Sequence, residues 1–205
     1  LLNDARAKSV VRDYYTQWLD IDGIKTLERT AANFPGFTQN TPNQLLRETE
    51  AFIDYVFWDS TSTLDELLTA DYTFANNNLA KFYGITEPGS NNFEKVSNPG
   101  KNFGVLSQGS LMARYARDEE TAPILRGVFV LEKLMCVHLA PPTDDSGIVV
   151  VPPELDPTLT TRERWSKTTG QGDCLQCHRI MNPAGFIFEN YDSVGRWRDK
   201  ENNLD

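Results

Sequence analysis

Cys174-Leu175-Gln176-Cys177-His178 is the most informative stretch of this chain, because it follows the pattern Cys-x-x-Cys-His. Two thiols three residues apart lie on one helical turn, where each can add to a vinyl group of a haem. The adjacent His178 then presents an imidazole nitrogen to the iron. The pattern predicts covalent haem c, held by Cys174 and Cys177, with His178 as the proximal iron ligand.

Three other uses of the cysteine pair stay open. The chain has three Cys, and an odd number rules out complete internal pairing into disulfides. The pair could be a reversible dithiol, but that arrangement usually follows a strand in a βαβ pattern, which this sequence does not show. It could be half of a zinc site, with Cys136 or His138 joining from a distance. It could also form a structural Cys174–Cys177 disulfide.

Apolar and aromatic residues surround the motif and supply candidate wrapping for a porphyrin. Phe186 and Phe188 are the two that we expect to contact the cofactor. The full set of candidates is Trp165, Met181, Phe186, Ile187, Phe188, Tyr191 and Trp197. Arg126, Arg196 and Arg198 are candidate partners of the haem propionates, because Arg forms bidentate contacts with carboxylates.

The second axial ligand is harder to identify. Met181 follows His178 by one helical turn, so it stays on the proximal side of the macrocycle and is set aside. His138 and Met112 are the candidates that we carry forward for the distal position. Other possibilities are Met135, which fits a core position better, a thiolate from Cys136, and an open iron that binds water.

Away from the motif, hydrophobic periodicity predicts a mainly α fold. The first helix carries Val10, Val11, Tyr14, Tyr15 and Trp18 on one face. The second begins at Thr41-Pro42, with Leu45, Phe52, Ile53, Val56 and Phe57 buried and with Glu48 and Glu50 towards solvent. Further helices are expected at residues 64–68, at 76–83 with Gly84 as the cap, and at 104–116. Another follows Pro123, with a face made of Ile124, Val128, Leu131 and Met135, and a short one carrying Trp165 is capped by Thr160-Thr161.

Two segments divide this pattern. Residues 86–103 are rich in Gly, Asn and Pro and read as a loop with one short strand near 93–96, and a Pro-rich linker starts at Pro141-Pro142. We therefore expect a helical domain at 1–100, followed by a small cytochrome c-like haem-binding domain at 101–205.

Composition excludes some classes of function. The 205 residues carry a formal net charge of −9, which disfavours nucleic-acid binding. No apolar run approaches the roughly 20 residues of a transmembrane helix. The chain opens on Leu1-Leu2-Asn3-Asp4 without Met, so we expect a fragment of a longer protein.

Several long motifs resemble the planctomycete-type cytochrome c domain family, which occurs in large secreted bacterial proteins. Residues 71–74 and 79–85 are similar to the helical domain that usually precedes the cytochrome domain. The motifs of the second half are Thr121-Ala122-Pro123-Ile124-Leu125-Arg126-Gly127, the helix ending at Cys136, Thr161-Arg162-Glu163-Arg164, the Cys174–His178 motif, residues 182–192 and Gly195-Arg196-Trp197-Arg198.

The resemblance implies an exported protein, periplasmic, cell-surface or secreted, with covalent haem. Its expected partners are a redox protein or other domains of the same longer chain. One departure is Asn182, where the family often has Asp; His138 is outside the family pattern, whereas Cys136 fits it. One-electron transfer is the expected function. The alternatives are a peroxidase-like oxidoreductase with an open distal iron, and a haem-free surface or scaffold protein.

Overall fold

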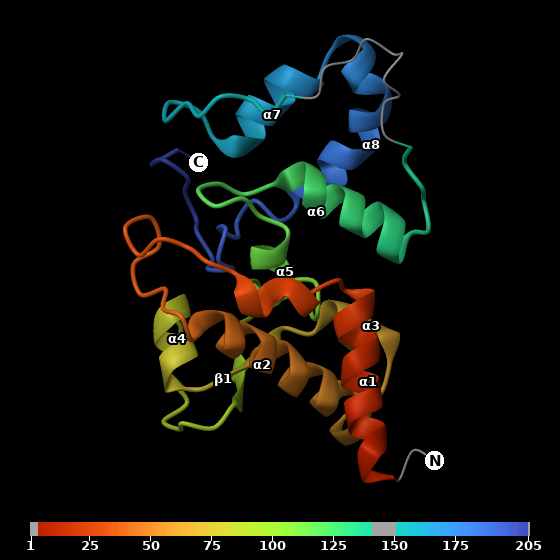
Figure 1. Ribbon diagram of the computed structural model, residues 1–205, viewed down its shortest axis with the longest axis vertical. Helices are drawn as coiled ribbons and strands as arrows, with labels where there is room; N and C mark the ends of the chain where they lie inside the picture. Colours follow the sequence, from red (N-terminus) through yellow and green to blue (C-terminus); the bar gives the residue numbers. More distant parts are fainter. Residues whose placement is uncertain (1–3, 141–150, 205) are drawn as a thin grey trace.

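The computed structural model describes residues 4–140 and 151–204, and it is mainly helical, as predicted (Figure 1). Helix α1 (Ala5–Trp18) begins at Asp4, whose side chain accepts a hydrogen bond from the Arg6 backbone N–H. The apolar face predicted for this helix is only partly buried. Val11, Tyr15 and Trp18 pack against the core, whereas Val10 and Tyr14 are more than 60% exposed.

Helix α2 (Thr41–Asp54) lies at the centre of the first half and runs into a π-helical turn, η2 (Tyr55–Asp59). Asn40, rather than Thr41, occupies the cap position, with Pro42 in the first turn. Leu45, Phe52, Ile53 and Val56 are buried as expected. The expectation that Glu48 faces solvent is wrong, because it falls between Leu45 and Phe52 on the same helix face and is only 2% exposed.

Short elements complete this half. The turn η1 (Asp22–Thr26) packs beside α2, helix α3 (Leu64–Thr69) follows η2, and helix α4 (Asn77–Tyr83) ends on Gly84 in the left-handed conformation, as predicted. The expected strand is β2 (Glu94–Ser97). It pairs antiparallel with β1 (Tyr72–Ala75), so that Tyr72 faces Ser97 and Ala75 faces Glu94.

The second half follows the predicted order of helices. Its elements are α5 (Gly109–Arg114), α6 (Pro123–Phe129) with the π-helical turn η3 (Val130–Leu134), α7 (Thr161–Thr169), η5 (Gly172–Cys174) and α8 (Leu175–Phe186). Residues 141–150 of the expected linker lie outside the described residues, and residues 151–156 form no helix or strand. The expected face after Pro123 is wrong in part: Leu131 is buried, but Met135 is 60% exposed, and Arg126 and Phe129 are buried in its place.

Two glycines bring α6 and α8 into backbone contact. A Cβ built on Gly127 would lie 2.3 Å from the Met181 carbonyl oxygen, and one on Gly185 would lie 1.8 Å from that of Pro123. Both distances are far below a van der Waals contact, so only glycine allows the two helices to approach this closely. Figure 1 shows α6 crossing below α8, above the elements of the first half.

The main core draws on both halves of the chain. Leu45 and Phe52 of α2 share one apolar cluster with Met112 of α5, Phe129 of α6 and Phe188. Figure 1 shows the C-terminal segment running down beside α5 before the chain ends. The division into domains at residue 100 stays a prediction.

Candidate functional site

Local backbone chemistry places the cysteine pair at the start of α8. Helix α7 begins with a capping box, in which Thr160 and Glu163 satisfy each other's backbone N–H groups, and it ends at Gly170. Gly172 then takes φ +59°, which glycine adopts without strain, and η5 leads into α8. Cys174 becomes the cap residue of α8, with Cys177 and His178 in its first turn. The predicted helical turn is confirmed.

Both thiols are accessible from outside. Cys177 is exposed, Cys174 is half-buried, and neither sulfur is in a disulfide. Because residues three and four apart share a helix face, Cys174, Cys177, His178 and Met181 lie on one side of α8. Leu175 and Ile180 are apolar side chains of the same helix that remain over 40% exposed. The turn therefore combines accessible thiols with exposed apolar surface.

The His178 ring is held by a chain of hydrogen bonds that starts at a backbone carbonyl. The Thr169 hydroxyl donates to the Trp165 carbonyl oxygen at 2.6 Å, so this hydroxyl is free only to accept from the Asn182 amide nitrogen, 2.9 Å away. The Asn182 amide oxygen is thereby turned towards His178, at 2.9 Å from Nδ1. Since an amide oxygen only accepts, His178 Nδ1 carries the proton.

This arrangement leaves Nε2 of His178 as the nitrogen with the lone pair. A neutral imidazole with one nitrogen donating to a fixed acceptor is the usual state of a histidine that ligates a metal through its other nitrogen. Two accessible thiols on the same turn are the groups that form thioethers with haem vinyls. The chemistry of this donor set fits a covalently held haem.

The two residues predicted as candidates for the second axial ligand lie in different surroundings. Met112 is fully buried in the main core. The His138 side chain is 82% exposed after η3, with Nδ1 3.4 Å from a Glu132 carboxylate oxygen. Cys136 is also exposed and takes φ +54° at the end of the same helix. The identity of the distal ligand stays a prediction.

The two phenylalanines also differ. Phe186, the last residue of α8, is half-buried, with the Arg162 guanidinium carbon 5.8 Å from its ring centre. Phe188 is only 3% exposed and belongs to the main core. Of the two residues predicted to contact the cofactor, only Phe186 has a ring that is still partly accessible to a ligand.

The arginines predicted to face propionates have protein partners. Arg126 is 1% exposed and donates to backbone carbonyls around it, so the expectation that it faces a ligand is wrong. Arg196 forms an ion pair with Asp192 at 2.8 Å, and Arg198 lies between Glu189 and Glu201 at 3.5 and 3.3 Å. Arg126 therefore fastens the C-terminal segment to α6, whereas the ion pairs of Arg196 and Arg198 lie within that segment.

Two known families match parts of the chain. Residues 102–201, which include the Cys174–His178 turn, match the family model PSCyt3, a protein of unknown function (DUF1588). The second half of the chain is thus similar to PSCyt3. Residues 1–85 match PSD4, a protein of unknown function (DUF1592). Both families are associated with planctomycete cytochromes c, and the name PSCyt3 suggests a cytochrome-related role for the half that carries the cysteines.

Other comparisons give no match: neither a curated protein nor a solved structure is significantly similar to the chain. Within residues 4–140 and 151–204, no helix has the length and apolar character needed to cross a bilayer. In the same described residues, no three His, Cys, Asp or Glu side chains converge as a metal-binding group.

Sequence reasoning missed the role of Asn182 and Thr169. The sequence spacing could have identified Asn182, because it lies four residues after His178 and therefore on the same helix face. Thr169 belongs to another helix, and only the packing of α7 beside α8 brings its hydroxyl to Asn182.

Proposed function

We propose that this chain is a c-type haem-binding module of an exported bacterial redox protein, and that it transfers single electrons. The observation that supports it most directly is the first turn of α8. That turn presents two accessible thiols next to a histidine whose Nδ1 is already committed to Asn182. The similarity of this half to PSCyt3 supports the same function.

Each residue of the turn has a distinct task. Cys174 and Cys177 would hold the haem through thioether bonds to its two vinyl groups, with each thiol proton going to the vinyl carbon that does not bind sulfur, so that nothing would be released. His178 Nε2 would ligate the iron, and Asn182 fixes the orientation of the imidazole ring through its hydrogen bond with Nδ1. When bound, haem c supplies an iron that cycles between the ferric and ferrous states.

Charge and location complete the proposal. The net charge of −9 favours a basic redox partner, because complementary charges accelerate the encounter of two proteins. Haem is attached to c-type cytochromes outside the cytoplasm, so we place the protein in the periplasm, on the cell surface or in the medium. The redox partner is a separate protein or another domain of a longer chain.

The test is a visible spectrum of the protein made in a periplasm with a c-type maturation system. We expect a sharp reduced α-band of the c type, and no spectral change when carbon monoxide is added to the reduced protein. The absence of haem in the purified chain would overturn the proposal. Rapid binding of carbon monoxide would instead show an open distal iron and support the peroxidase-like alternative.

Two single substitutions identify the distal ligand in the same preparation. If His138 is the ligand, His138→Ala converts a six-coordinate spectrum to a five-coordinate one, and Met112→Leu leaves it unchanged. If Met112 is the ligand, the outcomes are reversed, and the haem must reach the main core.

A further inference from the structure

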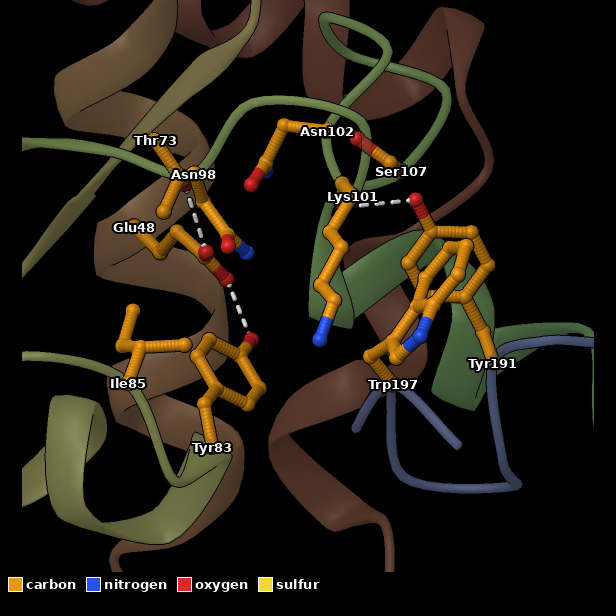
Figure 2. Close-up of a pocket in the computed structure, with 11 residues that line it drawn as sticks. Glu48, Thr73, Tyr83, Ile85, Asn98, Lys101, Asn102, Ser107, Tyr191 and Trp197 are labelled. Carbon is orange, nitrogen blue, oxygen red and sulfur yellow. Dashed lines mark hydrogen bonds between the residues drawn. The ribbon is translucent and has the colours of Figure 1, made fainter. Parts of the chain in front are cut away.

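A small pocket far from the cysteine turn joins the two halves of the chain (Figure 2). One side is formed by Glu48 of α2, Thr73 of β1 and Tyr83 of α4, and Figure 2 shows Lys101 and Trp197 on the opposite side. Its inner cavity has a volume of about 30 Å³. A cavity of this size holds one or two water-sized groups.

Glu48 forms the floor and is held by three donors. The Thr73 hydroxyl donates to its Oε1 at 2.6 Å, and the Tyr83 hydroxyl and the Gly109 backbone N–H donate to its Oε2 at 2.5 and 3.3 Å. Burial raises the pKa of this carboxyl to about 7, although the three hydrogen bonds act in the opposite direction. Oε2 is fully used, while Oε1 retains room for another donor.

Asn102 supplies a buried acceptor with no partner. It is 7% exposed, and its Oδ1 accepts no hydrogen bond from the described residues. Figure 2 shows this amide pointing into the space between Glu48 and Lys101. A buried polar atom is normally hydrogen-bonded, so Asn102 Oδ1 calls for a donor from outside the chain.

The opposite wall supplies a cation and an aromatic surface. Among the described residues, the Lys101 ammonium has no carboxylate partner and lies 5.7 Å from the centre of the Trp197 ring. This wall is preorganised, since Tyr191 donates to the Lys101 carbonyl oxygen at 2.8 Å and packs edge-on against Trp197 at 5.3 Å. Trp197 is itself fixed by a hydrogen bond to Asp199.

These groups favour a neutral ligand that both donates and accepts hydrogen bonds. A free cation would interact favourably with Asn102 Oδ1 and Glu48 Oε1, but the Lys101 ammonium in the same small pocket would repel it. An anion would pair with Lys101, but it would meet the Glu48 carboxylate and leave Asn102 without a donor. A ligand with several hydroxyl groups can donate to Asn102 Oδ1 and accept from Lys101 Nζ. The C–H face of a sugar ring also packs well against an indole.

We propose that this pocket binds a neutral carbohydrate, with a hydroxyl or hydroxymethyl group inserted towards Asn102, a further hydroxyl at Lys101, and the sugar ring against Trp197. The cavity is too small for the ring itself, which therefore stays at the mouth. The proposal does not depend on haem, because none of its residues belongs to the Cys174–His178 turn. It gives the module a second property, which is attachment to a polysaccharide or glycan surface.

The test is saturation-transfer NMR of the 205-residue chain with methyl β-glycosides of glucose, galactose, mannose and xylose. We expect saturable binding of at least one glycoside. Methylammonium and acetate, used as charged probes of similar size to the inserted group, should not bind. Lys101→Met should weaken glycoside binding about tenfold, the loss expected for one hydrogen bond from a charged donor.

Lys95→Met is the matched control. Lys95 also lies over aromatic rings, 3.7 Å from the Tyr72 ring centre and 4.5 Å from that of Tyr55, but it does not line the pocket. Its variant should bind the glycoside as the wild type does. The proposal is overturned if no glycoside binds, which would leave ordered water as the occupant. It is also overturned if methylammonium binds instead, or if Lys101→Met and Lys95→Met behave alike.

Discussion

His178 Nδ1 donates a hydrogen bond to Asn182 Oδ1 at 2.9 Å, and the direction of this bond is imposed by the Trp165 carbonyl two links away. A carbonyl oxygen only accepts, so each group in the chain has one permitted role. The consequence is a histidine whose tautomer is set by the protein before any ligand binds.

The first prediction concerns that tautomer. In the haem-free protein, ¹⁵N NMR of neutral His178 should show a proton on Nδ1. Thr169→Val should give a mixture of the Nδ1-H and Nε2-H tautomers, because Asn182 then loses the hydroxyl that fixes the orientation of its amide. Thr168→Val is the matched control: the Thr168 hydroxyl also donates to a carbonyl four residues earlier, Arg164 O at 3.0 Å, but is not linked to Asn182. Equal effects of the two variants would contradict the relay.

The second prediction concerns the pH dependence of stability. Because the pKa of Glu48 is raised from 4.5 to about 7 by burial, the folded state favours the protonated carboxyl. This contribution is fully present below about pH 4.5 and is lost as the pH rises through about 7. Relative to Glu48→Gln, which cannot ionise, the wild type should lose roughly 3 kcal/mol of unfolding free energy across this window. Urea unfolding at several pH values measures the difference, and parallel curves for the two proteins would refute the assignment.

The third prediction concerns the contact between α6 and α8. Gly185→Ala places a methyl group 1.8 Å from the Pro123 carbonyl oxygen, and neither backbone can yield without separating the helices. We expect a loss of about 2–3 kcal/mol or more, despite the gain of about 1 kcal/mol that Ala usually brings to a helix. Gly23→Ala is the control, because its nearest neighbour is Arg114 Nε at 4.0 Å. Equal free energies of unfolding for the two variants would show that the close contact between α6 and α8 does not require glycine at position 185.

The fourth prediction concerns Arg126. Burial lowers the pKa of its guanidinium to about 10, so it stays charged at neutral pH beside Glu189. Arg126→Met removes the donors of several backbone carbonyls, those of Met112, Tyr115, Phe188, Tyr191 and Asp192. It should destabilise the fold by about 3–5 kcal/mol.

Two comparisons make this prediction specific. Arg47→Met, at a residue whose side chain is 66% exposed and pairs with Glu50, should change stability by less than about 1 kcal/mol. Arg126→Lys should not restore the wild-type value, since an ammonium has three donors and lacks the planar fork. A stable Arg126→Met protein would show that the carbonyls find other donors.

Local sequence signals predicted the helices well and their surroundings less well. Gly84 as a cap, Thr160-Thr161 as a helix start and the turn at Cys174 each depend on nearby residues, and the structure confirms them. Strand β1 was missed because its partner lies about twenty residues further along the chain. Glu48 was expected to face solvent and Arg126 to face a ligand, because their hydrogen-bonding partners come from distant segments that only the fold assembles.

The most direct test of the central claim is the intact mass of the denatured chain after production in a periplasm with c-type maturation. We predict a mass higher by one haem for the wild type and for Cys136→Ser, and no covalent haem for the Cys174→Ser/Cys177→Ser double variant. A wild-type chain at its unmodified mass, from a host that matures a control cytochrome c, would contradict the account.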